Sequence, residues 1–250
     1  MFAAKKSLGQ NFLQNHAVLK KIVAAAQLTN DEVVIEVGPG MGALTEYLLK
    51  EAQKVIAIEK DTRLFKILSE KFAVSIESGK LELINGDALK IPPPSGPFKL
   101  VANIPYYITS PLIDHFVRDN PQNLPKLVVL LMQKEVAEKI CAVPPHMNVL
   151  ALHIQTFGDP KIIGMVSRHD FKPVPRVDSA ILKIEFSGAQ KVECDLNKYF
   201  ELIHTAFSQK RKMLRAVLDA DLLKKAAVDP TRRPETLSAK EWETLSKCAG

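Results

Sequence analysis

Hydrophobic residues follow two alternating patterns along the first 186 residues: short continuous runs, and stretches in which leucines and isoleucines recur every three or four positions. The first pattern predicts buried strands and the second predicts amphipathic helices. Strands that alternate with helices are typical of βα units in a mostly parallel sheet. The predicted strands lie at 33–37, 54–59, 80–86, 99–103, 126–132, 161–166 and 178–186. The pattern therefore predicts an α/β fold with a seven-stranded sheet.

A different pattern begins after Phe186, where no further strand signal occurs. The stretch 188–195 has the composition of a linker, and apolar residues then recur at helical spacing. The residues that carry this spacing are Phe200, Ile203, Phe207, Leu214 and Val217. We therefore predict two domains, an α/β domain over 1–188 and a small all-helical domain over 189–250.

Length and composition are those of a soluble protein with a full core. The chain has 250 residues, of which 46% are hydrophobic, yet no apolar run approaches the roughly 20 residues that span a bilayer. The N-terminal residues lack the apolar stretch of a secretory signal, so we expect a cytoplasmic protein. The cysteines, Cys141, Cys194 and Cys248, have neither metal-ligand nor disulfide spacing, so we expect no metal site.

Positive charge is modest overall but unevenly distributed. A net charge of +6 favours anionic partners only weakly. Lys5, Lys6, Lys20 and Lys21 lie in the first thirty residues, which contain no acidic residue. Near the other end the basic residues are Lys210, Arg211, Lys212 and Arg215. Such clusters are typical either of solvated helix faces or of phosphate-binding surfaces.

The first predicted strand leads into a glycine-rich turn. Gly38, Gly40 and Ala43 match the fingerprint G-x-G-x-x-G/A, and glycine lets the backbone approach a ligand closely. Glu59 ends the second strand, where a carboxylate can accept hydrogen bonds from both hydroxyls of a ribose. These residues fit a nicotinamide dinucleotide or S-adenosylmethionine, and an ordinary tight βα turn is the alternative without a ligand.

Polar groups also follow the third and fourth predicted strands. Asp87 lies where its carboxylate would accept a hydrogen bond from an adenine amino group, although a lone Asp here is also typical of a capped turn. The fourth strand ends at Asn103, whose side-chain oxygen and the Ile104 carbonyl would accept hydrogen bonds from an exocyclic amino group. Pro105 would restrict the backbone, and Tyr106 would stack on a base.

This arrangement favours methyl transfer to the amino group of a planar base. Adenine N6 is a poor nucleophile because its lone pair is delocalised into the ring, and two acceptors would favour a pyramidal nitrogen. A sulfonium methyl group is already activated, so alignment at roughly 3–3.5 Å supplies most of the catalysis without a metal or a strong base. The alternative is that Asn103 and Tyr106 only end the strand and pack.

Seven segments together resemble the ribosomal RNA adenine N6,N6-dimethyltransferase family, in particular its bacterial small-subunit members. They are LGQNFLQN, EVGPGMGALT, NGDAL, NIPYYITSPLI, MQKEVAEKI, FKPVPRVDSAIL and RRPETLS, and they span nearly the whole chain. The resemblance implies a Rossmann-like class I methyltransferase fold and S-adenosylmethionine as cofactor. It also implies dimethylation at N6 of two adjacent adenines near the 3′ end of 16S rRNA, within the small subunit or its precursor, and a role in subunit maturation. We expect a monomer that does not associate with membranes.

The resemblance further implies roles for individual residues. The N-terminal segment would fold over the cofactor, and the glycine loop, supported by Glu36, would line its methionine portion. Glu59 would bind the ribose, and Asp87 with Ala88 the adenine. The implied cofactor-binding residues are Asn11, Leu13, Glu36, Gly38, Gly40, Glu59, Asp87, Ala88 and Asn103.

Other implied roles concern the target RNA. Asn103 would lie between cofactor and base, and Phe171 would cover the base face opposite Tyr106, although residue type alone makes Phe171 a core aromatic. The segment SQKRKMLR, read as a helix, resembles an rRNA-contacting element of the family, and it contains Lys210, Arg211, Lys212 and Arg215. One segment departs from the family pattern: residues 141–148 are short and lack glycine, which weakens the expectation of rRNA docking near that loop.

Three rival functions are consistent with parts of the sequence. A 23S rRNA adenine methyltransferase of the macrolide-resistance type shares the fold and the chemistry, but the continuation YITSPLI after Tyr106 favours the 16S enzyme. A mainly non-catalytic ribosome-assembly factor would need only the basic surfaces. A nicotinamide enzyme would use the glycine loop but not the Asn103 segment.

Overall fold

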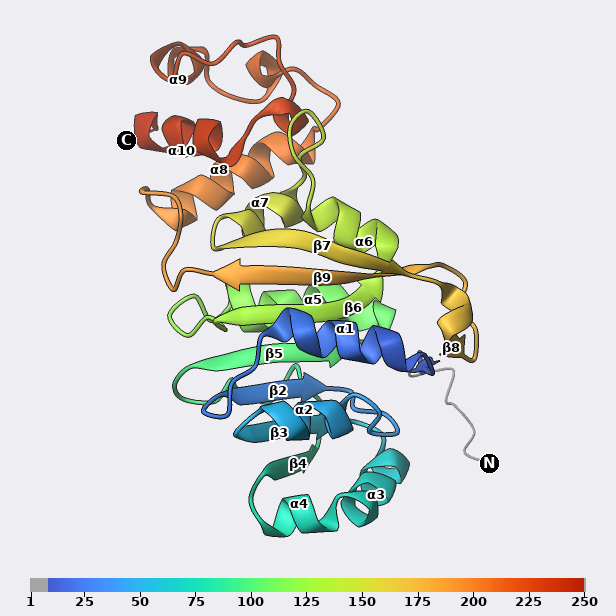
Figure 1. The fold of residues 1–250 in the computed structure, drawn as a ribbon. Helices are drawn as coiled ribbons and strands as arrows, with labels where there is room; N and C mark the ends of the chain where they lie inside the picture. Colours follow the sequence, from blue (N-terminus) through green and yellow to red (C-terminus); the bar gives the residue numbers. More distant parts are fainter. Residues whose placement is uncertain (1–8, 250) are drawn as a thin grey trace. The chain divides into compact units, whose positions relative to one another are not determined.

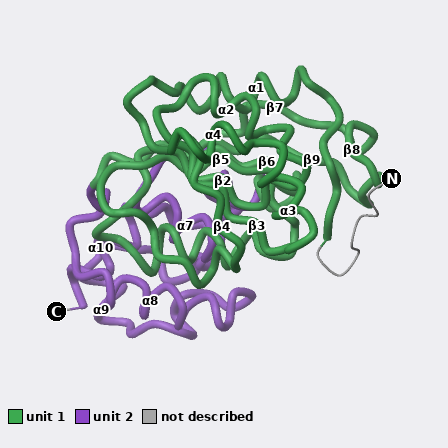
Figure 2. Tube along the Cα trace, turned by 90° about the horizontal axis from the view of Figure 1, so that it is seen from below, with its two compact units in different colours: residues 1–137, 161–188 green, residues 138–160, 189–250 purple. Residues whose placement is uncertain are grey.

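The computed structural model describes residues 9–249, which form two compact units. The first unit comprises 1–137 and 161–188, and the second comprises 138–160 and 189–250 (Figure 2). The sequence pattern predicts 138–160 as part of the α/β domain, whereas this segment groups with the helical unit. The physical reason is the helix α7 (Val149–Gln155), because its residues Ala151 and Leu152 are buried in the core of the second unit.

The first unit is built on the predicted seven-stranded, mostly parallel sheet (Figure 1). The strand order is β4-β3-β2-β5-β6-β9-β7. β3 and β5 flank β2 in parallel, β4 and β6 extend the parallel part, and β9 runs antiparallel to β6. The bounds are β2 (Val33–Val37), β3 (Lys54–Glu59), β4 (Leu81–Asn85), β5 (Phe98–Asn103), β6 (Leu127–Gln133), β7 (Gly158–Val166) and β9 (Ser179–Phe186). The α/β prediction is therefore confirmed.

The apolar runs of the sequence become the buried centre of this sheet. Residues 128–132 of β6 are almost completely buried, as expected where a parallel sheet is covered on its faces. α1 packs against β5 and β6, and α3 packs against β3 and β4. Asn15 caps α1 and Asp61 caps α3, since each side chain accepts a hydrogen bond from a backbone N–H of the first turn. The helices are α1 (His16–Ala26), α2 (Thr45–Glu51), α3 (Thr62–Lys71), α4 (Ala73–Glu77), α5 (Thr109–Ile113) and α6 (Lys134–Ile140).

Two short strands outside the main sheet join distant parts of the first unit. β1 (Phe12–Leu13) pairs antiparallel with β8 (Phe171–Lys172), so that Leu13 lies opposite Phe171. The backbone N–H of Gln14 donates to the carbonyl of Asp170 over 2.8 Å, and Asn15 Nδ2 donates to Asp170 Oδ1 over 2.9 Å. The N-terminal segment is thereby held against the chain that precedes β9.

The second unit is helical and has its own core. Trp242, Tyr199 and Ile203 are completely buried there. Asp195 caps the helix α8 (Leu196–Ser208), and Ser238 forms a capping box with Glu241 at the start of α10. Besides α7 and α8, its remaining helical segments are α9 (Ala220–Lys225), α10 (Ala239–Cys248) and the 3-10 turns at Leu214–Ala216 and Pro234–Thr236.

The predicted basic helix over SQKRKMLR is wrong. α8 ends at Ser208, residues 209–212 form a turn, and only Leu214–Ala216 resume a single 3-10 turn. The backbone N–H groups of Leu214 and Arg215 donate to the carbonyls of Arg232 and Pro230 instead of continuing a helical ladder. Burial of Leu214 in the core fixes this turn, so tertiary contacts override the local helical spacing.

We expect Gly42→Ala to destabilise the first unit by about 2–5 kcal/mol. Gly42 has a φ of +78°, which costs an L-residue about 1–2 kcal/mol, and an added Cβ would lie 2.5 Å from Phe72 Cε2, an overpacking that costs about 1–3 kcal/mol. Gly79→Ala is the matched control, because Gly79 has a similar φ of +75° but no atom within 4 Å of the added Cβ. Urea unfolding of both variants tests this expectation, and equal losses of stability would show that the contact with Phe72 does not matter.

Candidate active site

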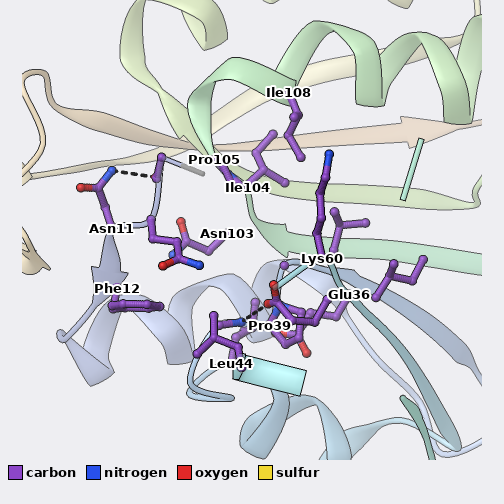
Figure 3. A pocket seen from close by; sticks show the side chains of 18 of the residues that line it. Asn11, Phe12, Glu36, Pro39, Leu44, Lys60, Asn103, Ile104, Pro105 and Ile108 are labelled. Atoms are coloured by element: carbon purple, nitrogen blue, oxygen red, sulfur yellow. Dashed lines mark hydrogen bonds between the residues drawn. The ribbon is translucent and has the colours of Figure 1, made fainter. Parts of the chain in front are cut away.

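One cavity of about 260 Å³ lies at the carboxyl ends of the parallel strands β2 to β5 (Figure 3). Parallel strands bring their carboxyl ends to one edge of a sheet, where α/β proteins bind ligands. Every residue predicted for catalysis or cofactor binding lines this cavity. These residues are Asn11, Leu13, Glu36, Gly38, Gly40, Glu59, Asp87, Ala88, Asn103, Ile104, Pro105, Tyr106 and Phe171.

The glycine loop forms the floor of the cavity with left-handed backbone conformations. Gly38 has a φ of +67°, and its N–H donates to the carbonyl of Ile58 over 2.9 Å. Gly40 has a φ of +62°, and a Cβ there would lie 3.1 Å from the ring of Phe12. Phe12 is thus a cavity residue that the sequence motifs did not predict. The pairing of β1 with β8 holds it against the glycine loop.

Glu59 is fixed by two backbone donors. The N–H of Gly40 donates to Oε2 over 3.1 Å, and the N–H of Asp61 donates to Oε1 over 2.8 Å. Burial raises the pKa of the Glu59 carboxyl, and these two hydrogen bonds oppose that rise. Each carboxylate oxygen keeps a further lone pair, so the group is positioned to accept hydrogen bonds from a diol.

Glu36 supports the glycine loop from below. Its side chain is 1% exposed, and Thr45 Oγ1 donates to Oε2 over 2.6 Å. Burial raises the pKa of Glu36 to about 8. At neutral pH the carboxyl group is therefore mostly protonated, and it links the end of β2 to the start of α2 without a net charge.

Asp87 is engaged by two donors. Lys60 Nζ lies 2.8 Å from Oδ2, and the N–H of Leu89 donates to Oδ1 over 3.2 Å. The hydrogen bond from Lys60 lowers the pKa of Asp87. The hydrogen bond from the N–H of Leu89 forms the capped turn that is typical of a lone Asp. The ion pair between Lys60 and Asp87 was not predicted from the sequence. Its only sequence signal is a lysine directly after Glu59 at the end of a strand.

Asn103 and Ile104 present two free acceptors to the cavity. Figure 3 shows the Asn103 side chain between the N-terminal segment, with Asn11 and Phe12, and the loop at Pro39. Among residues 9–249, no group forms a hydrogen bond with the side-chain amide of Asn103 or with the backbone carbonyl oxygen of Ile104. The N–H of Ile104 donates to the carbonyl of Leu131 over 3.3 Å, which anchors the segment to β6. Two residues that line the cavity therefore carry acceptor oxygens that lack a partner within the described chain.

Two aromatic residues, Tyr106 and Phe171, also line the cavity. Tyr106 is half-buried, and its hydroxyl lies 2.8 Å from Ser179 Oγ. Phe171 lines the cavity but is 3% exposed and belongs to the core of the first unit, as its residue type alone predicts. Its pairing with Leu13 through β1 and β8 ties it to the N-terminal segment.

The basic residues predicted to contact RNA lie in the second unit and do not line the cavity. Lys210, Arg211 and Lys212 are exposed on the turn after α8, and Arg215 is exposed on the 3-10 turn Leu214–Ala216 that follows. No acidic group of the described chain forms an ion pair with any of them. Lys5 and Lys6 of the other basic cluster lie outside the described residues, whereas Lys20 and Lys21 are exposed on α1.

Residues 9–249 contain neither a metal-binding cluster nor a helix that could span a membrane. No group of three or more His, Cys, Asp or Glu side chains is arranged to hold a metal ion. No helix in this range is both long and apolar enough to cross a bilayer.

Comparison with known proteins relates the whole chain to rRNA-modifying enzymes. A family model described as ribosomal RNA adenine dimethylase matches residues 1–248. Proteins named ribosomal RNA small subunit methyltransferase A are 41% identical in Dehalococcoides mccartyi strain CBDB1, over 97% of this chain and 87% of that protein, and 39% identical in Lactococcus lactis strain IL1403, over 98% and 90%.

Solved structures show the same relationship at lower identity. The fold superposes on a dimethyladenosine transferase from Plasmodium falciparum with a TM-score of 0.82, at 28% identity over 94% of this chain and 95% of that one. It also superposes on the 23S rRNA methyltransferase ErmE with a TM-score of 0.80, at 28% identity over 95% and 99% of the two chains. Both comparisons cover nearly all of the chain.

Proposed function

This chain belongs to the ribosomal RNA adenine dimethylase family, and we propose that it dimethylates N6 of two adjacent adenines near the 3′ end of 16S rRNA, with S-adenosylmethionine as methyl donor. Its relatives at about 40% identity are named small-subunit methyltransferases and match nearly the whole chain. The observation that carries the chemistry is the pair of free acceptors at Asn103 and Ile104 inside the cavity.

The residues of the cavity fit an adenosyl cofactor. S-adenosylmethionine would supply an electrophilic methyl group on a sulfonium centre. The fixed carboxylate of Glu59 suits the ribose diol, and Asp87, with the neighbouring backbone of Ala88, suits the adenine edge. Gly38 and Gly40 leave room for the methionine portion beside Asn11 and Leu13. We propose these contacts as the basis of cofactor binding.

Asn103 and Ile104 would act on the target amino group. Their oxygens would accept the two N6 hydrogens and hold the nitrogen lone pair toward the methyl carbon, which is alignment and electrostatic stabilisation rather than general-base catalysis. The cofactor would supply the methyl carbon, so that in each transfer a new N6–C bond would replace the S–C bond and the nitrogen would release one proton to solvent. Tyr106 is held by Ser179 at the side of this position, where its ring would stack on the base.

The rivals have weaker support. ErmE shares the fold, but its 28% identity is below the 41% of the small-subunit relatives. A non-catalytic assembly factor would not need two free acceptors beside a carboxylate of fixed orientation.

We further propose that the enzyme acts in small-subunit maturation as a cytoplasmic monomer, since bacterial ribosomes assemble in the cytoplasm. Sedimentation of the purified chain tests the monomer.

The decisive experiment incubates the protein with labelled S-adenosylmethionine and unmodified small subunits, and in parallel with large subunits. We expect label only in the small subunit, on two adjacent adenines near the 3′ end of its RNA. Label in large-subunit RNA would favour the macrolide-resistance activity. Absence of label in both, with RNA binding retained, would favour a non-catalytic assembly factor.

Removal of the four basic side chains on the turn after α8 should make RNA binding less dependent on salt. Each phosphate contact contributes about 0.7–0.9 to the slope of log K against log salt, so replacement of Lys210, Arg211, Lys212 and Arg215 by Ala should reduce that slope by about 3. Filter binding to small-subunit RNA at several KCl concentrations measures it. The control replaces the exposed lysines Lys50, Lys66, Lys80 and Lys161 by Ala, and equal slopes for both quadruple variants would refute the assignment.

A further inference from the structure

Tyr107 differs from the neighbouring Tyr106 in the direction of its ring. Both belong to the 3-10 turn η2 (Tyr106–Ile108) that follows Pro105. Tyr106 turns inward to Ser179, whereas Tyr107 is 54% exposed. Among the Phe, Tyr and Trp residues within 9–249 it is the one that is exposed.

This exposed ring lies at the cavity that contains Asn103. Tyr107 is among the residues that line the cavity, although more than half of its side chain contacts solvent. A residue with both properties lies at the cavity mouth. A single exposed ring elsewhere on the surface would need no explanation, but here the ring is exposed and lines the cavity in which the target base would bind.

The ring is held in a defined position. Its Cδ1 lies 3.3 Å from the point where a Cβ would stand on Gly9, so the backbone of the N-terminal segment packs against one part of it. The turn beneath is fixed by the N–H of Ile108, which donates to the carbonyl of Pro105, and by Thr109 Oγ1, which donates to the carbonyl of Tyr106. A ring that is already ordered loses little conformational entropy when a ligand stacks on it.

Basic side chains lie near the same cavity as the ring. Lys60 is about half exposed, lines the cavity together with Tyr107, and forms an ion pair with Asp87. Lys90 is exposed and close enough to Asp87 to lower its pKa. An exposed aromatic ring with basic neighbours is the combination by which proteins bind single-stranded nucleic acid.

We propose that Tyr107 is a stacking platform for the base adjacent to the target adenine. The inference rests on the proposed function, because two adjacent adenines must enter the cavity in turn. While one base is in the cavity, its neighbour has lost a stacking partner and lies at the mouth. Stacking on Tyr107 replaces that partner for either adenine, so one ring serves both modification events.

Tyr107→Ala should therefore weaken substrate binding without slowing the chemical step. Loss of one base–aromatic stack corresponds to about a 10-fold change in affinity. We expect KM for unmodified small subunits to rise about 10-fold and kcat to change less than about twofold, since the stack is the same in ground and transition states. Tyr107→Phe keeps the ring and should retain the parent KM. Val74→Ala, at a 79% exposed apolar residue on α4, is the matched control.

A spectroscopic measurement separates stacking from a structural role of the turn. Small subunits that contain 2-aminopurine in place of one of the two adenines would report quenching when that base stacks. We expect the parent chain and Tyr107→Phe to quench it, and Tyr107→Ala and Tyr107→Leu not to. Calorimetric affinity for S-adenosylhomocysteine should be equal in all four, which shows that the cavity is intact.

The outcomes separate this inference from the proposed function. If the parent chain does not methylate small subunits, the proposed function itself fails. If it methylates them while Tyr107→Ala keeps the parent KM and quenching, only the stacking inference is overturned. A fall in kcat at unchanged KM would also overturn it, because that result assigns Tyr107 to positioning of the turn. If Tyr107→Ala does not fold, Tyr107→Leu and Tyr107→Phe provide the same comparison.

Discussion

Asn103→Ala should abolish most methyl transfer while leaving the protein folded and able to bind both substrates. The amide has no hydrogen-bond partner within residues 9–249, so its removal leaves no protein group unsatisfied. The backbone at Asn103, in register with Leu131 of β6, is unchanged by truncation to Ala. We therefore expect a change in the free energy of unfolding within about 0.5 kcal/mol.

The loss in rate has a direct physical cause. Without Oδ1 only the Ile104 carbonyl remains to orient N6, and removal of one preorganised hydrogen-bonding group from such a site typically costs about 10²–10³ in kcat. Single-turnover methylation of small subunits measures it, together with RNA affinity by filter binding. Asn197→Ala is the control, because Asn197 is exposed on α8. Unchanged methyl incorporation in Asn103→Ala would remove the assigned role.

Glu59→Ala should largely eliminate cofactor binding. The change removes the acceptor for the N–H groups of Gly40 and Asp61 as well as the two oxygens proposed to bind the ribose. Loss of two charge-assisted hydrogen bonds, at about 1.5–3 kcal/mol each, corresponds to an increase of at least about 10²-fold in Kd. The backbone donors left without an acceptor should also lower stability by about 1–3 kcal/mol each.

Thermal unfolding with and without ligand measures this effect and tests the cofactor. A ligand that binds only the folded state raises Tm in proportion to its occupancy. We expect S-adenosylhomocysteine to raise the Tm of the parent chain and of the exposed control Glu70→Ala, and NAD to raise neither. Glu59→Gln, which keeps the side-chain shape and one acceptor, should retain a reduced shift. A full shift in both Glu59 variants, or stabilisation by NAD alone, would contradict the assignment.

Much of the fold and of the cavity follows from local sequence. The apolar runs become the central strands β2, β5 and β6 because a strand buried on both faces must be largely apolar. Gly38, Glu59 and Asn103 share one cavity because each follows or ends a parallel strand, and parallel strands end at one edge. No long-range information is needed for that inference.

Other features depend on contacts between distant residues. The ion pair of Lys60 with Asp87 forms because β3 and β4 are neighbours in register, which a lysine after Glu59 does not reveal. Apolar residues on both sides of Arg211 recur at helical spacing, yet α8 ends at Ser208. The reason is that Leu214 is buried in the core and its backbone N–H donates to the carbonyl of Arg232. Segment 138–160 joins the second unit for a similar reason, since the buried side chains of α7 belong to that core.

The sequence by itself determined the α/β fold and the cavity residues on the strand ends, because periodicity and glycine conformation act over a few neighbouring residues. Only the tertiary structure decided that β1 pairs with β8 and thereby brings Phe12 over Gly40 and Leu13 opposite Phe171. It likewise decided that of two adjacent tyrosines Tyr106 is half-buried against Ser179 and Tyr107 is exposed. These outcomes depend on which strand edges and surfaces remain free after the sheet has formed, and no local pattern records that.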